Sequence, residues 1–323
     1  MALSRELKDR PIARRLAGVP LVLFRANGVA AAARDRCPHR NHPLSLGRVA
    51  GGLLECPYHG WRFAADGRCV EIPGLEGPAP QDPRLRAEMV AVRELHGAVF
   101  VRLSPEGPAE PDLPPLLGAP GHDHFWWTQP PWRGRAIDAV ENVLDPYHTN
   151  FIHDGIIRER RRRQAVEVTI TTEEGGVEAV YAQDRPDRGW MSRALEGPRK
   201  RSSGRFYPPA TVQARWEGPE GLTLCVTAFF TPETEGSFRP FSCFTTPRGR
   251  APGWVKERLI RLFLEPVVTQ DRVALARQYE AMAAFGGPHF RQGPLDRLSA
   301  RVMRLYQGEA LEPGVEGPFR VML

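Results

Sequence analysis

The sequence is poor in cysteine and lysine and has no long apolar run. Its 323 residues include five cysteines, far too few for a disulfide scaffold, and the odd number fits a reducing compartment. No stretch approaches the roughly 18 apolar residues of a membrane-spanning helix. Residues 1–18 also lack the apolar segment of a secretory signal. We therefore expect a cytoplasmic protein that does not cross a membrane.

The net charge of +6 comes almost entirely from arginine. Of 44 basic residues only three are lysines, and the arginines are spread along the whole chain. Such a dispersed excess of arginine indicates a compositional bias rather than a phosphate-binding face, so we do not expect nucleic acid as a partner. One cluster, Arg158 and 160–163, is either a solvated surface segment or a docking patch for an acidic redox partner.

The length of the chain and the distribution of its apolar, proline and glycine residues predict two domains. Residues 21–103 contain short apolar stretches separated by turn signals such as Asn27-Gly28 and Asp66-Gly67, which is typical of a small all-β domain. Residues 104–121 are dominated by proline and glycine and predict the domain edge. We place the two domains at residues 1–118 and 119–323.

The second domain is predicted to be α+β, with an antiparallel sheet and helices near its ends. A helix-compatible pattern covers residues 136–157, and strand-like alternation covers 165–182 and 209–245. Two further helices are predicted at 254–263 and 266–284, with Pro266 in the first turn of the second.

Two short segments of the first domain each pair a cysteine with a histidine. Cys37-Pro38-His39 is followed after sixteen residues by Cys56-Pro57-Tyr58-His59. Four such ligands could hold structural zinc or an iron–sulfur cluster. Zinc fingers usually pair cysteine with cysteine and histidine with histidine along the chain, so the mixed pairs favour a cluster whose two iron atoms have different ligands. The remaining cysteines are expected to be buried structural thiols: Cys69, Cys225 and Cys243.

The sequences C-P-H and C-P-Y-H-G-W resemble the Rieske [2Fe–2S] motif. The resemblance implies that Cys37 and Cys56 bind one iron atom, and that His39 and His59 bind the other as neutral imidazoles. A Rieske domain alone would be an electron carrier, so the remaining residues must show where the electrons are used.

A second group of candidate ligands lies in residues 141–153. Asp145 and His148 are three residues apart and would share one face of a helix. His148 and His153 are five apart, so they can converge on one metal only if the helix bulges or ends. Two histidines and one carboxylate form the ligand set of non-haem Fe(II) centres that activate O₂.

This segment resembles the E-N-x-x-D-x-x-H-x₄-H motif of the Rieske non-haem iron oxygenase α subunits, closest to the monooxygenase and demethylase branch. The resemblance covers essentially the whole chain and implies a helix-grip catalytic domain after the Rieske domain. It implies that His148 and His153 bind iron. The third ligand would be Asp271, in a late helix where Gln270 stands in place of the usual glutamate.

The resemblance also implies a role for Asp145 and an oligomeric state for the chain. Asp145 is expected to hydrogen-bond both His148 and the cluster ligand His59 of a neighbouring subunit, which implies a head-to-tail ring, usually a homotrimer. Asn142, beside the ligand helix, is a candidate for substrate contact. Aromatic residues are further candidates for the substrate pocket: Trp190, Phe206, Tyr207, Phe229, Phe230 and Phe241.

The expected function is that of a terminal oxygenase component. The cofactors would be one Rieske [2Fe–2S] cluster and one mononuclear Fe(II), with O₂ as co-substrate and a small aromatic or hydrophobic substrate. No G-x-G-x-x-G fingerprint is present, so NAD(P)H would act through a separate reductase or ferredoxin. The alternatives are a Rieske electron-transfer protein and a ligand-binding protein without oxygenase activity.

Overall fold

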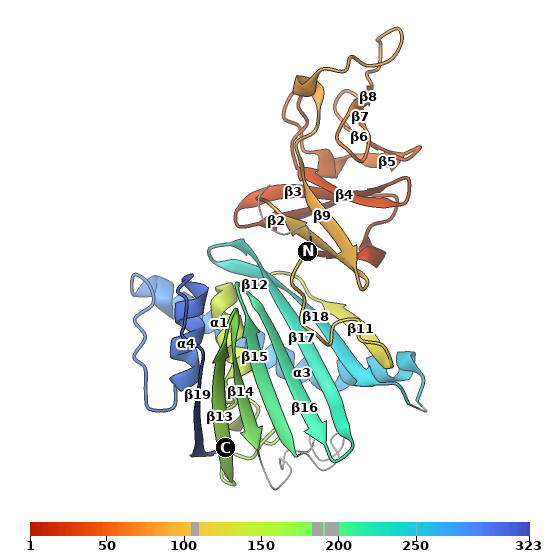
Figure 1. Ribbon diagram of the computed structural model, residues 1–323. Coiled ribbons are helices and arrows are strands. Elements are labelled where there is room, and N and C mark those ends of the chain that lie inside the picture. Colours follow the sequence, from red (N-terminus) through yellow and green to blue (C-terminus); the bar gives the residue numbers. More distant parts are fainter. Residues whose placement is uncertain (105–109, 183–189, 191–199, 250) are drawn as a thin grey trace. The chain divides into compact units, whose positions relative to one another are not determined.

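A computed structural model describes residues 1–104, 110–182, 190, 200–249 and 251–323. The chain divides into two compact units, Met1–Leu113 and Pro114–Leu323 (Figure 1). No described helix is both long enough and apolar enough to span a bilayer.

The N-terminal unit is an all-β structure, as its turn-rich sequence predicts. A six-stranded antiparallel sheet has the order β1-β10-β9-β4-β3-β2, and a smaller sheet has the order β5-β6-β7-β8. The larger sheet contains β1 (Ala2–Leu3), β2 (Ile12–Leu16), β3 (Val19–Ala26), β4 (Val29–Arg34), β9 (Met89–Leu95) and β10 (Ala98–Arg102). The smaller sheet contains β5 (Arg48–Ala50), β6 (Leu53–Glu55), β7 (Arg62–Phe63) and β8 (Cys69–Glu71). Short 3₁₀ turns lie at Ser4–Glu6, Leu44–Leu46 and Pro83–Leu85.

The turn residues act as the sequence predicts. Asn27 and Gly28 both have positive φ, +50° and +81°, and they close the two-residue hairpin between β3 and β4. This is the backbone that a two-residue hairpin requires for its strands to keep their twist. Beneath the smaller sheet, Phe24, Leu54 and Phe63 are fully buried in one apolar core. This core thereby anchors the segments that carry the two Cys–His pairs.

The C-terminal unit is a long antiparallel sheet with helices, which confirms the predicted α+β class. The strand order is β11-β18-β17-β16-β15-β14-β13-β19, and β12 also pairs with β18. The strands are β11 (His122–Thr128), β12 (Trp132–Arg133), β13 (Ala165–Glu173), β14 (Gly176–Ala182), β15 (Arg201–Tyr207), β16 (Thr211–Gly218), β17 (Gly221–Thr234), β18 (Ser237–Pro247) and β19 (Gly314–Met322). The helices are α1 (Ala136–Leu144), α3 (Gly253–Ala284) and α4 (Arg297–Tyr306), with a 3₁₀ turn at His148–Asn150.

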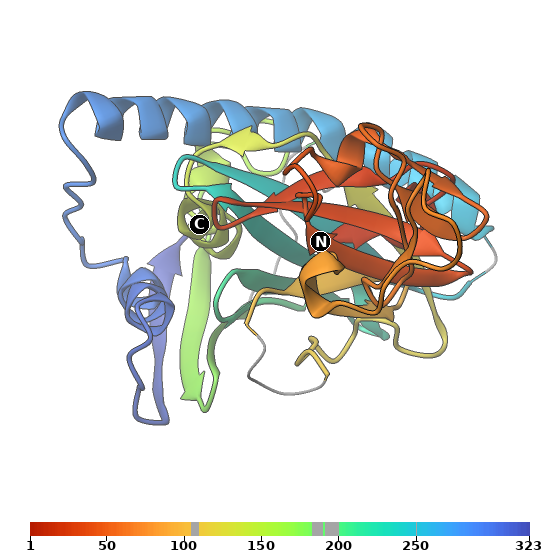
Figure 2. The ribbon, with the colours of Figure 1, turned by 90° about the horizontal axis from the view of Figure 1, so that it is seen from above.

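Figures 1 and 2 show α1 and the long helix α3 on one face of this sheet. Ile137 and Val140 of α1 are fully buried against the sheet, in the same core as Phe206 and Phe238. Leu275 of α3 belongs to this core too. The sheet and the two helices therefore enclose the space in which the second group of candidate ligands lies.

Two helix predictions were wrong in detail. The helix expected over 136–157 ends at Leu144, because Pro146 disfavours the helical conformation of Asp145. The helices expected at 254–263 and 266–284 form one continuous helix that contains Pro266. Proline leaves the carbonyl four residues earlier without its helical donor. Pro266 and that residue, Leu262, are both exposed, so water can satisfy the carbonyl.

Candidate metal centres

The two Cys–His segments of the N-terminal unit form turns with the same backbone pattern. The Cys37 N–H donates to the His42 carbonyl, and the Cys37 carbonyl accepts from the Asn41 N–H, both at 2.9 Å. In the second turn, the Cys56 N–H donates to the Trp61 carbonyl and the Cys56 carbonyl accepts from the Gly60 N–H.

The fifth residue of each turn has a left-handed backbone, Asn41 with φ +58° and Gly60 with φ +71°. At Gly60 a side chain would also collide with neighbouring structure, because an added Cβ would lie 2.8 Å from Cγ of Pro73. Asparagine and glycine are the residues that tolerate this conformation best. The local sequence therefore folds two equivalent loops, each of which presents one cysteine and one histidine.

The two turns bring their side chains together as two like pairs, cysteine with cysteine and histidine with histidine. Cys37 and Cys56 are both buried, and their thiols are close enough to influence each other's pKa. The ring centroids of His39 and His59 lie 4.6 Å apart, and His39 stacks on Trp61. Nδ1 of His39 is buried and has no hydrogen-bond partner within the described residues, so it is free to bind a metal.

Electrostatics at this group favours a bound cation. Burial raises the pKa of the Cys37 thiol, and the adjacent Cys56 adds to the rise. Two thiolates at one buried point therefore need positive charge beside them, which iron supplies. The pKa of His39 is lowered by desolvation and by His59 and Arg40, which favours the neutral imidazole that a metal binds. The residues fit a [2Fe–2S] cluster of the Rieske type.

The end of α1 determines the geometry of the second centre. Oδ1 of Asp145 accepts a hydrogen bond from the Tyr147 N–H at 2.7 Å, which turns the chain directly after the helix. His148 begins the following 3₁₀ turn, and His153 lies beyond its end. The two histidines therefore converge because the helix has already ended, which is one of the two ways that their spacing allows.

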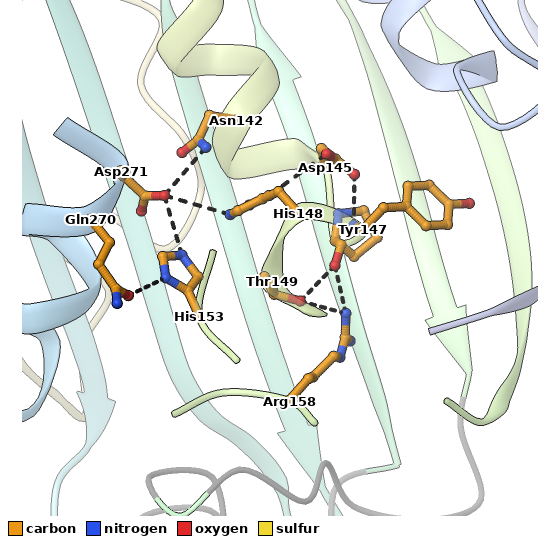
Figure 3. A network of polar contacts seen from close by, with 10 residues as sticks. Asn142, Asp145, Tyr147, His148, Thr149, His153, Arg158, Gln270 and Asp271 are labelled. Carbon is orange, nitrogen blue, oxygen red and sulfur yellow. Dashed lines mark hydrogen bonds and ion pairs between the residues drawn. The ribbon is translucent and has the colours of Figure 1, made fainter. Parts of the chain in front are cut away.

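The structure brings His148, His153 and Asp271 together. Their donor atoms lie within 4.8 Å of one another. Oδ1 of Asp271 is 3.2 Å from Nε2 of His153 and 3.6 Å from Nε2 of His148 (Figure 3). Asn142 donates to the same oxygen at 3.3 Å, so this residue supports the carboxylate from α1. Two imidazoles and one carboxylate fit a mononuclear iron site with open positions.

Gln270 defines which nitrogen of His153 faces the site. Its Oε1 can only accept, so Nδ1 of His153, 2.8 Å away, carries the proton. Nε2 then points its lone pair toward Asp271, an arrangement that needs a proton or a metal ion between the two groups. Burial lowers the pKa of His153, but the bonds and charge from Asp271 and Gln270 outweigh burial and give a net rise. The Asp271 carboxylate therefore favours a positive charge at this ring nitrogen, which is a proton in the absence of a metal ion.

Asp145 lies beside His148 but does not hydrogen-bond to it here. The distance from its Oδ2 to Nδ1 of His148 is 3.7 Å, and that nitrogen is buried without a hydrogen-bond partner within the described residues. The Asp145 side chain is 42% exposed, whereas that of His148 is 15% exposed. The carboxylate therefore keeps one side open to a further partner.

Arg158 is not the surface residue that the arginine cluster predicts. Its side chain is only 7% exposed, and Nη1 donates to the Pro146 carbonyl at 2.8 Å and to the Thr149 hydroxyl at 3.0 Å (Figure 3). It thus ties together the loop that carries His148. The rest of the cluster, 160–163, is exposed. The basic-patch interpretation is wrong for Arg158, because a residue that clamps a ligand loop is not available to a docking partner.

A cavity of about 490 Å³ lies next to the triad, between the sheet and α1 and α3. Asn142 and Phe230 line it, as the sequence suggested. Phe206 and Phe241 are instead fully buried in the core, and Trp190 is 46% exposed. Neither Tyr207 nor Phe229 is among the residues that line the cavity. The other thiols are buried as expected: Cys69, Cys225 and Cys243.

Comparison with known proteins agrees with both centres. Residues 1–88 match the Rieske [2Fe–2S] domain family, and residues 135–305 match the vanillate O-demethylase oxygenase C-terminal domain family. The chain is 38% identical over 332 residues to 4beta-methylsterol monooxygenase of Methylococcus capsulatus, which covers 93% of this chain and 86% of that protein.

Other relatives are matched over shorter regions. Protein TIC 55 of Pisum sativum is 31% identical over 64% of this chain and 36% of its own length. The oxygenase component of dicamba O-demethylase from Stenotrophomonas maltophilia is 34% identical over 47% of this chain and 45% of its own length. The aligned regions thus cover less than half of the length of these two relatives. The crystal structure of dicamba monooxygenase bound to dicamba shares the fold, with a TM-score of 0.78 at 23% identity over 95% of this chain and 94% of that one.

Proposed function

This chain belongs to the Rieske non-haem iron oxygenase α subunits, and we propose that it is the terminal oxygenase component of a multicomponent enzyme that hydroxylates or demethylates an organic molecule. One observation carries the proposal: His148, His153 and Asp271 meet beside a cavity of about 490 Å³. Iron held by these three residues would supply O₂ activation, and a [2Fe–2S] cluster held by Cys37, His39, Cys56 and His59 would supply the electrons.

The residues of this chain perform the surrounding tasks. Gln270 keeps the His153 tautomer that presents Nε2, and Asn142 holds the carboxylate oxygen of Asp271 in place. Arg158 fixes the loop that carries His148. The lining of the cavity is mostly apolar, which disfavours water beside a reactive centre.

We propose further that electrons pass between subunits. The cluster ligand His59 is exposed on its own unit, and the carboxylate of Asp145 keeps an open side. A hydrogen bond from His59 of a neighbouring subunit to Asp145 would link the cluster to His148 and its iron. Such head-to-tail contacts close into a ring, and we propose a homotrimer. The exposed arginines 160–163 remain a candidate docking patch for a separate NAD(P)H-dependent reductase or ferredoxin.

The buried free thiols support a reducing, cytoplasmic location.

The reaction is tested with the intact protein, reconstituted with iron and sulfide and coupled to a surrogate reductase. We expect about three iron atoms and two labile sulfides per chain, and ¹⁸O from ¹⁸O₂ in the product. His148→Ala should retain the cluster absorbance and lose the oxygen incorporation. About two iron atoms in the fully reconstituted wild type would leave only electron transfer or ligand binding as functions.

A further inference from the structure

The cavity beside the triad has an extended apolar floor on the sheet. Along β17, Leu224, Val226, Ala228 and Phe230 all line it, which is the alternation expected for one face of a strand. From Leu224 to Phe230 this face is about 20 Å long at the usual rise per residue. In the middle of the floor Gly204, Ala214 and Val226 pair across three adjacent strands; Leu144 of α1 packs over Gly204, and the small side chain of Ala214 faces the cavity beside it.

Helix α3 forms a matching apolar roof. Its cavity-lining residues recur at helical spacing: Lys256, Leu259, Ile260, Leu264, Val267, Val268, Asp271 and Leu275. The iron ligand Asp271 and Lys256 therefore lie on the same stripe, about 22 Å apart along the helix axis. The space above the floor extends well beyond the length of a single aromatic ring from the triad.

The cations of the cavity are already engaged. Apart from Asp271, the charged residues that line it within the described chain are Asp145, Arg158 and Lys256. Nζ of Lys256 donates to the Asp123 carboxylate at 2.7 Å and to the Pro247 carbonyl at 2.8 Å. Arg158 holds the ligand loop. Among the described residues, no unengaged cation therefore faces a substrate carboxylate, and Asp145 would repel one, so burial of such a group beside these residues costs free energy.

One polar atom at the far end of the cavity lacks a partner. The hydroxyl of Thr246 is buried, lines the cavity and has no hydrogen-bond partner within the described residues. Thr246 precedes Pro247, whose carbonyl binds Lys256, so it lies at the end of the cavity opposite Asp271. Buried hydroxyls are normally hydrogen-bonded. A neutral oxygen or hydroxyl of a bound ligand would satisfy this one.

We infer that the substrate is an elongated, uncharged, mostly apolar molecule of the lipid class, with a hydroxyl or carbonyl group near Thr246 while its oxidised carbon lies at the triad. This inference rests on the proposed function and specifies the substrate of the same site. The shared chemistry is an apolar body of the length of the cavity with one neutral polar end. A rigid polycyclic alcohol and a flexible long-chain alcohol both have it.

Binding is measured on the reconstituted holoenzyme without reductase, by the change in tryptophan fluorescence, because Trp127 and Trp216 line the cavity. The probes are cholesterol and 1-hexadecanol, both delivered from cyclodextrin, and benzoate. Saturable binding of either alcohol, tighter than that of benzoate, supports the inference, and the tighter alcohol identifies a rigid or a flexible occupant. Tighter binding of benzoate, or no saturable binding of either alcohol, overturns it.

Two variants locate the ligand. Thr246→Val keeps the shape and removes the hydroxyl, so the dissociation constant of the preferred alcohol should rise about three- to tenfold. Ala214→Phe fills the middle of the floor and should abolish binding. The matched control is Thr231→Val, on the opposite face of β17. Unchanged affinity in Thr246→Val overturns the inference, even if Ala214→Phe fails to fold. Binding of an alcohol without any turnover contradicts only the proposed function, and oxygen uptake with benzoate but no alcohol binding contradicts only this inference.

Discussion

The two metal centres of this protein are built in opposite ways. In the N-terminal unit, two short turns with the same hydrogen-bond pattern carry the four candidate cluster ligands, and each turn is determined by its own few residues. In the C-terminal unit, the segment after α1 supplies two of the candidate iron ligands and α3 supplies the third. There, His153 and its partner Gln270 are 117 positions apart in the sequence, and Asn142 and Asp271 are 129 positions apart.

This difference determines how each centre can fail. A local turn depends on the conformation of its backbone, so it is sensitive to a change at a single left-handed residue. A centre assembled from distant elements depends on hydrogen bonds between those elements, and each bond can be weakened without unfolding the unit. Substitutions that affect one centre and spare the other therefore test the comparison directly.

The largest effect is expected from removal of the carboxylate on α3. In Asp271→Ala the triad loses its anionic ligand, so we expect oxygen-dependent turnover to fall at least about 100-fold and iron to fall from about three to about two atoms per chain. The cluster absorbance should not change. Arg272→Ala, an exposed neighbour on the same helix, is the control. Retention of the third iron atom in Asp271→Ala would show that the triad does not hold it.

A smaller effect is expected at Gln270, which contacts the metal ligand and not the metal. Gln270→Leu removes the acceptor for Nδ1 of His153, so both tautomers become available and the ring is less well oriented. We expect the affinity for Fe(II) to fall by about 10- to 100-fold. Anaerobic titration against a competing chelator measures it, with the exposed Gln278→Leu as control. Equal affinities in the two variants would remove Gln270 from the centre.

The local centre was the easier one to predict from sequence, for a physical reason. The spacing of Cys37, His39, Cys56 and His59 reflects two self-contained turns, so the motif contains most of the geometry. The all-β and α+β classes also follow from strand alternation and from turn residues such as Asn27 and Gly28. Conformations that depend only on the residues of one segment could thus be predicted from the sequence.

Features that depend on tertiary packing could not be read in the same way. The role of Arg158 in the ligand loop was missed because a run of arginines looks like solvated surface until its burial is known. The continuity of α3 through Pro266 depends on the exposure of Leu262. A signal for the cavity was present but unused: apolar residues at helical spacing before Asp271 mark the face of α3 on which the ligand lies.

The sensitivity of the cluster turns is tested at Gly60. In Gly60→Ala the new Cβ meets Cγ of Pro73 at 2.8 Å, whereas in Gly74→Ala, with a similarly positive φ, it meets nothing within 4 Å. Both variants carry the left-handed strain of about 1–2 kcal/mol. Only Gly60→Ala should also lose cluster absorbance, while the triad still binds Fe(II). Equal cluster content in both variants would mean that the turn tolerates displacement and that its local geometry is less critical than the motif implies.

The smallest predicted effect concerns Glu141, whose negative charge is disfavoured by its burial on α1. Burial raises the pKa of Glu141 on α1, although a hydrogen bond from Ser299 opposes the rise. The stability from this group is therefore present below its ordinary pKa of 4.5 and is lost as the pH rises through the folded value. Glu141→Gln keeps an acceptor for Ser299 without a charge. Relative to wild type, its free energy of unfolding should increase between pH 4 and pH 8 by about 1 kcal/mol or less. Denaturant titrations at the two pH values measure this change, with the exposed Glu265→Gln as control. A difference that is constant with pH, or that decreases as the pH rises, would show that Glu141 stays ionised at no cost and that the packing of α1 does not oppose its charge.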